Sequence, residues 1–126
     1  MKKLSILLLL LFVAASACFA QTTDVNQLRD EFIARRVKEQ IPQIQSMCET
    51  IENIESETLE EIGFKLSWTT AMEEYIRVYG EVLKIIKNTN YSDNLPLWQQ
   101  HMKKCMTLEQ EIIRINKEAI KYFKTN

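Results

Sequence analysis

The last third of the chain carries apolar residues that recur every seven positions. One row consists of Trp98, Cys105, Ile112 and Ala119, and a second of Leu108, Ile115 and Tyr122. Two rows at this spacing lie along one side of an α-helix and are typical of helices that pack in bundles. The spacing therefore predicts a long helix from about residue 96 to residue 124.

Three earlier stretches, residues 24–40, 43–62 and 67–87, also show helical periodicity. The residues expected on their apolar faces include Val25, Leu28, Phe32, Ile33 and Val37, then Ile44, Met47, Cys48, Ile51, Ile54, Leu59 and Ile62, then Met72, Ile76, Tyr79, Leu83 and Ile86. Pro42 separates the first two helices, because proline kinks or ends a helix. Gly63 is expected to end the second helix, and Thr70 and Glu73 have capping-box spacing for the third.

The composition agrees with helices alone. The chain has only two glycines and two prolines, and the turn-rich segment 88–94 separates the last two predicted helices. We therefore predict an all-α fold, a small antiparallel three- to four-helix bundle with the first helix separated by a Pro42 kink. Whether that first helix overhangs the bundle or folds back onto it stays open at this point.

The N-terminus has the order of a secretory signal peptide: a basic start, a short apolar run and small residues. Lys2 and Lys3 precede an apolar run over residues 4–13, and four small residues follow. We predict a removed signal peptide over residues 1–20 and one domain over residues 21–126, secreted or periplasmic. The alternative is lipoprotein processing at Cys18, which would anchor the protein to a membrane by acyl chains.

Two cysteines remain after cleavage at Ala20, which suggests a disulfide in an exported protein. With the second helix turning near Gly63, a rise of about 1.5 Å per residue places Cys48 about 20 Å from that turn and Cys105 at nearly the same level. The sequence thus predicts a Cys48–Cys105 disulfide.

The chain offers little catalytic chemistry. It has one histidine, and the mature part has only Gly63 and Gly80, too few for a glycine-rich phosphate loop. We expect no enzyme activity and no cofactor. The competing reading is a copper site, because imidazole, thiolate and thioether ligands suit Cu(I). Its ligands would be His101, Met102, Cys105 and Met106.

Charge argues against nucleic acid as a partner. Without Lys2 and Lys3, 14 basic residues face 17 acidic ones, a net charge of about −3. An acidic block over residues 49–61 and a basic last segment are expected to be solvated faces that attract each other within the bundle. Tyr91 and Trp98 are the aromatics expected to be exposed, as anchors for a partner.

These patterns predict a non-enzymatic protein-interaction module that binds another protein or itself. The alternatives are an envelope carrier of copper or a small ligand, and a lipid-anchored structural surface protein. Contact with a membrane is expected only if Cys18 is lipidated.

Overall fold

The computed structural model describes residues 25–125, so the predicted signal peptide 1–20 and Cys18 lie outside the described residues. The elements in chain order are α2 (Val25–Arg35), η1 (Arg36–Gln40), α3 (Ile41–Glu52), α4 (Leu59–Asn88) and α5 (Leu95–Thr125). Over residues 25–125 the chain forms helices and turns but no strand, which confirms the predicted all-α class.

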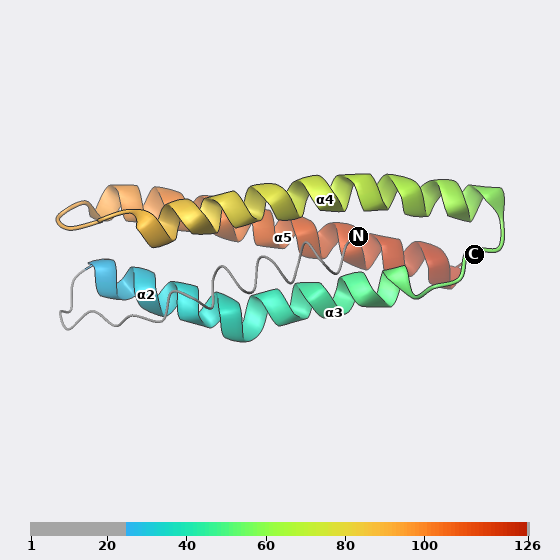
Figure 1. The fold of residues 1–126 in the computed structure, drawn as a ribbon, viewed down its shortest axis with the longest axis horizontal. Helices are drawn as coiled ribbons and strands as arrows, with labels where there is room; N and C mark the ends of the chain where they lie inside the picture. Colours follow the sequence, from blue (N-terminus) through green and yellow to red (C-terminus); the bar gives the residue numbers. More distant parts are fainter. Residues whose placement is uncertain (1–24, 126) are drawn as a thin grey trace.

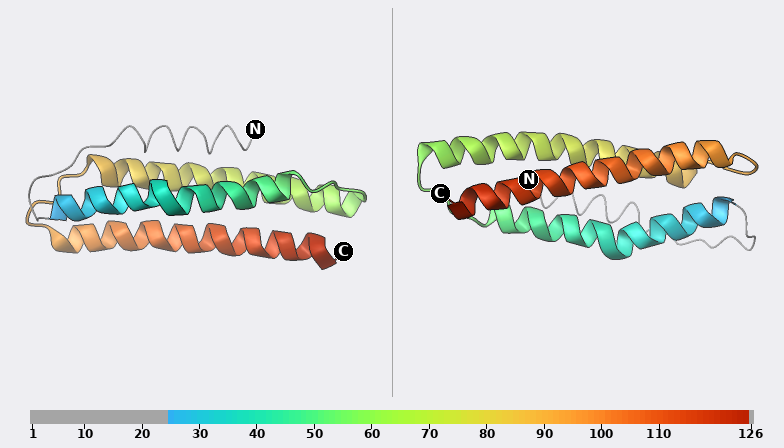
Figure 2. Two further views of the ribbon diagram at one scale, coloured as in Figure 1. Left: turned by 90° about the horizontal axis from the view of Figure 1, so that it is seen from below. Right: turned by 180° about the vertical axis from the view of Figure 1, so that it is seen from behind.

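The helices form an antiparallel three-membered bundle, seen from the side in Figure 1 and from two further directions in Figure 2. The first member is a continuous rod of α2, η1 and α3, and α4 and α5 are the other two. α2 contacts both α4 and α5, and α3 contacts α5. The first predicted helix therefore packs on the bundle, as part of one rod with the second.

Pro42 does not end the rod. It occupies the first turn of α3, where a missing N–H is tolerated, and the preceding turn widens into the π-helical segment η1. There the N–H of Ile41 donates to the carbonyl of Arg36, five residues back. The wider turn brings both Arg36 and Ile41 to the buried side of the rod.

Polar side chains of α2 fasten it to the loop between α4 and α5. Asn26 donates to Asn90 Oδ1 at 2.9 Å and accepts from the backbone N–H of Tyr91 at 2.7 Å. Arg29 donates to the carbonyl of Thr89 at 2.8 Å. Side chains of α2 thus form hydrogen bonds with backbone groups of the loop that would otherwise bond to water. These bonds hold the start of the rod against the loop.

The chain turns between the first two bundle members about ten residues earlier than predicted. α3 ends at Glu52, and Thr58 starts α4 with a complete capping box, in which its side chain accepts from the N–H of Glu61. Gly63 therefore lies inside α4 and ends no helix. The predicted cap at Thr70 is also wrong, since its hydroxyl donates to the carbonyl of Leu66 within the helix.

The core agrees with the predicted apolar rows of the last two helices. Trp98, Cys105, Ile112 and Ala119 are all buried, and so are Met72, Ile76, Tyr79, Leu83 and Ile86. Aromatic packing closes the end of the bundle at the C-terminus of α5. There Phe64 of α4 stacks on Tyr122 of α5 at 3.8 Å between ring centroids. The expected exposure of Tyr91 and Trp98 is wrong, because both side chains are buried.

We predict that Thr58→Ala lowers the free energy of unfolding by about 1 kcal/mol, because it removes the cap that starts α4. Urea denaturation followed by circular dichroism measures this. Thr70→Ala is the matched control on the same helix, and we expect it to change stability by less than about 0.5 kcal/mol. Equal effects of the two substitutions would contradict the observed start of α4.

Candidate functional site

A buried polar cluster joins all three members of the bundle. Arg36 of η1 donates to both carboxylate oxygens of Glu109 on α5, from Nε at 2.9 Å and from Nη2 at 3.2 Å. The hydroxyl of Tyr79 on α4 donates to the same carboxylate, and the Cys105 thiol lies 3.8 Å from it. The Arg36 guanidinium also stacks on the Phe32 ring at 3.8 Å.

The environment suppresses ionisation of the two weak acids in this cluster. Burial, followed by the Glu109 carboxylate, raises the pKa of the Cys105 thiol to about 12. Burial, followed by the charges of Cys105 and Glu109, likewise holds the pKa of Tyr79 well above its ordinary value. Neither group is suited to act as a nucleophile or a base near neutral pH. The chemistry of the cluster is that of a structural clamp.

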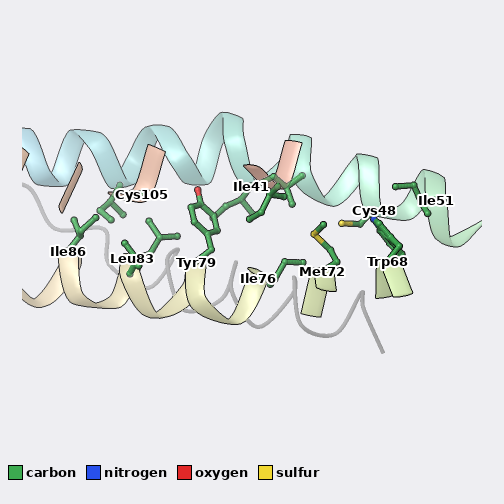
Figure 3. Close-up of a cluster of buried hydrophobic side chains, with 14 of the residues drawn as sticks. Ile41, Cys48, Ile51, Trp68, Met72, Ile76, Tyr79, Leu83, Ile86 and Cys105 are labelled. Carbon is green, nitrogen blue, oxygen red and sulfur yellow. The ribbon is translucent and has the colours of Figure 1, made fainter. Parts of the chain in front are cut away.

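A second buried polar cluster lies further along α5. The indole N–H of Trp68 donates to Asn116 Oδ1 at 2.8 Å, and the Asn116 amide lies 3.8 Å from the sulfur of Cys48 and 4.0 Å from that of Met72. Figure 3 shows Cys48 beside Met72 and Trp68, and Cys105 towards the other end of the core, with Tyr79 between them.

The predicted Cys48–Cys105 disulfide is therefore wrong for this structure, in which both thiols are reduced. Cys48 lies level with Asn116, which is 11 residues after Cys105 on the same helix. At about 1.5 Å per residue this is a separation of roughly 16 Å, whereas the Cα atoms of a disulfide lie about 4–7 Å apart. The prediction placed the connection between the helices near Gly63, about 20 Å from Cys48. Because α3 already ends at Glu52, Cys48 lies only one helical turn from that connection.

The side chains proposed as copper ligands face different surroundings. His101 Nδ1 is hydrogen-bonded to the Tyr91 hydroxyl at 2.6 Å, and Cys105 faces Glu109. Met102 packs at the edge of the core, whereas Met106 is exposed. Over residues 25–125 there is no group of three or more His, Cys, Asp or Glu side chains placed to hold a metal ion.

An open groove of about 370 Å³ runs along the seam between α2 and α5. Its apolar lining is Leu28, Phe32, Trp98 and Met102, and its charged lining is Glu31, Arg35 and Arg36. The Phe32 and Trp98 rings meet edge to face at 5.3 Å.

The first two turns of α4 present a stripe of large apolar side chains to solvent. Leu59, Ile62 and Leu66 are 87%, 43% and 62% exposed. Their spacing of three and four residues places them on one side of the helix, opposite the buried Trp68. Isolated exposed apolar residues are ordinary, whereas a contiguous exposed apolar group is a candidate contact surface.

Acidic residues lie next to this stripe in the sequence. Residues 53–61 contain Glu55, Glu57, Glu60 and Glu61 and no basic residue. The next base along the chain, Lys65, is engaged, since its Nζ donates to the carbonyls of Glu52 and Ile54 at 2.8 and 2.7 Å.

The expected attraction between this acidic block and the basic end of α5 takes the form of one hydrogen bond, from the Tyr122 hydroxyl to Glu60 at 3.3 Å. Within the described part of the chain no ion pair joins the two segments. The exposed ion pairs on α4 and α5 lie within single helices, around Arg77 and Arg114, and the buried pair on α5 joins Glu109 to Arg36 of the rod. Glu61 also accepts from the N–H groups of Glu57 and Thr58, but no ion pair within the described residues neutralises the negative charge beside the stripe.

The apolar pattern of the sequence does not predict three polar residues that lie in the core of the described part of the chain. Arg36, Glu109 and Asn116 are buried, but a search for apolar residues passes over them. A signal was present, because Met102, Glu109, Asn116 and Phe123 form a third row with a spacing of seven. Two polar residues in such a row point to buried hydrogen bonds with another helix.

We predict that native Cys105 reacts with iodoacetamide at pH 8 at least about a hundredfold more slowly than a free thiol, because it is buried and its pKa is raised. In guanidinium without reductant, both Cys48 and Cys105 should be alkylated, which mass spectrometry of the intact protein detects. An unfolded, unreduced protein that takes up no label until a reductant is added would instead show a disulfide.

Comparison with known protein families, curated proteins and solved structures gave no match to this chain. Across residues 25–125, every helix is too short or too polar to span a membrane.

Proposed function

We propose that the protein is a small exported, non-enzymatic module that binds another protein through the outward face of the first two turns of α4. The observation that supports this is the exposed stripe of Leu59, Ile62 and Leu66. Export is proposed from the leader sequence, with a secreted or periplasmic location.

Covering this stripe would yield substantial binding energy. Burying a leucine or isoleucine side chain fully contributes about 1.5–3 kcal/mol, and three of them lie within two helical turns. The stripe is rigidly presented, since the capping box of Thr58 fixes the start of α4 and the Lys65 contacts hold the preceding connection. A rigid surface loses little conformational entropy when it binds.

The charge around the stripe indicates the chemistry of the partner. We call the four glutamates Glu55, Glu57, Glu60 and Glu61 the negative rim. Their charge attracts Lys and Arg and repels acidic segments. An apolar strip of this length on a helix is well matched by another amphipathic helix, whose apolar face lies along it. The proposed partner is therefore a protein segment that forms a basic amphipathic helix.

The two alternatives have less support. A copper carrier needs His101, Met102, Cys105 and Met106 to converge, whereas these side chains face different surroundings. A lipid-anchored surface protein depends on Cys18, which lies outside the described residues. An anionic membrane surface is also a poor match for the negative rim of the α4 stripe.

A synthetic amphipathic helix can stand in for the natural partner in a binding test. We expect a dye-labelled peptide of about 18 residues, with leucine on one face and lysine on the other, to bind with a Kd in the low micromolar range. The double variant Leu59→Ser/Leu66→Ser should weaken binding at least about tenfold, because it removes two large apolar contacts. Fluorescence anisotropy measures both values.

Two controls make the result specific. Ile85→Ser removes an apolar residue of the same helix that is 52% exposed but lies outside the stripe, and it should change Kd less than about twofold. A peptide with glutamate in place of lysine should not bind. Equal binding by the wild type and the double variant, or equal binding of both peptides, would contradict the proposal.

A further inference from the structure

We propose that the groove between α2 and α5 is a second binding site, for a small amphipathic carboxylate with an apolar tail and one acidic head group. It is separate from the α4 surface and does not depend on the protein-binding function. Its volume of about 370 Å³ lies within the range of small-molecule sites.

The groove has an apolar part and a cationic part. Leu28, Phe32 and Trp98 line the part nearer the α4–α5 loop, whereas Arg35 and Arg36 follow along the rod. From Leu28 to Arg36 the helix rises roughly 12 Å, enough for an extended tail and a head group. The arrangement thus matches a molecule that is apolar at one end and charged at the other.

The charges of the lining favour an anion at the arginine end. Arg36 forms its ion pair through Nε and Nη2, so Nη1 is the guanidinium nitrogen that the Glu109 carboxylate does not use. Glu31 already accepts a hydrogen bond from Gln27 at 3.2 Å. Arg35 makes no hydrogen bond or ion pair within the described part of the chain, which leaves its guanidinium available to a carboxylate.

The surroundings of Arg36 hold its guanidinium in one orientation. Its guanidinium is held between the Phe32 ring and Glu109, on a π-helical turn, and such turns are frequent at functional sites. Because the Glu109 pair and Phe32 fix the orientation of Arg36, an anion would meet a donor that needs no reorganisation. The other acidic residue of the lining, Glu31, repels a bound carboxylate, so its removal should strengthen binding.

The two tryptophans allow the test to use the wild-type protein. In an NMR titration with decanoate, below its micelle concentration, the indole N–H signal of Trp98 should shift and saturate. The indole signal of Trp68, which is buried beside Asn116 at a distant level, should stay in place. No saturable shift, or equal shifts of both indoles, would overturn the proposal.

Charge variants make the test specific for the head group. Arg35→Gln should weaken decanoate binding at least about tenfold, and Glu31→Gln should strengthen it, because repulsion is removed. Arg114→Gln, on the far part of α5, should leave the Kd unchanged. Decanol, which has the same tail without the charge, should bind at least about tenfold more weakly than decanoate. Equal binding of decanol and decanoate, or no effect of Arg35→Gln, would refute a carboxylate site.

Discussion

The buried ion pair between Arg36 and Glu109 is the strictest constraint on how the three members of the bundle pack. It joins the first rod to α5, and the Tyr79 hydroxyl adds α4 to the same carboxylate. Apolar cores tolerate substitutions that conserve volume, whereas a buried carboxylate that loses its donors is strongly destabilising. The cluster therefore fixes the axial register of the three bundle members relative to one another.

This axial register determines which side chains meet at each candidate binding surface. With Glu109 opposite Arg36, the start of α5 runs beside α2, and the seam between them forms the groove that ends at Arg36. At the far end, Asn116 meets Trp68, and Tyr122 stacks on Phe64, so the first turns of α4 are held with their apolar stripe outward. One register thus orients both candidate binding surfaces.

Much of the fold was predictable from periodicity. The row from Trp98 to Ala119 and the buried face of α4 follow directly from apolar spacing, which reports the side of a helix that faces the core. The boundary near residue 58 was less accessible, because Ile54, Leu59 and Ile62 continue the apolar pattern of α3 although the chain turns between them. Thr58 and Glu61 have the same three-residue spacing as Thr70 and Glu73, so this spacing alone does not locate the cap.

The functional surfaces were harder to predict for a different reason. Leu59 and Ile62 look like core residues in the sequence, and only the bundle shows that they are exposed. Conversely, Arg36 looks like a solvent-exposed residue until the π-helical turn rotates it inward. Both cases depend on the arrangement of whole helices, which local patterns do not contain.

A double-mutant cycle on the buried ion pair tests the central claim most directly. Arg36→Met and Glu109→Leu, each measured by urea denaturation, should each destabilise the protein by about 3–5 kcal/mol, because each leaves one buried charge without its partner. The double variant should recover most of the loss, since two apolar side chains then replace the pair. Single variants that cost less than about 1 kcal/mol, or losses that simply add, would show that the pair does not set the register of the bundle.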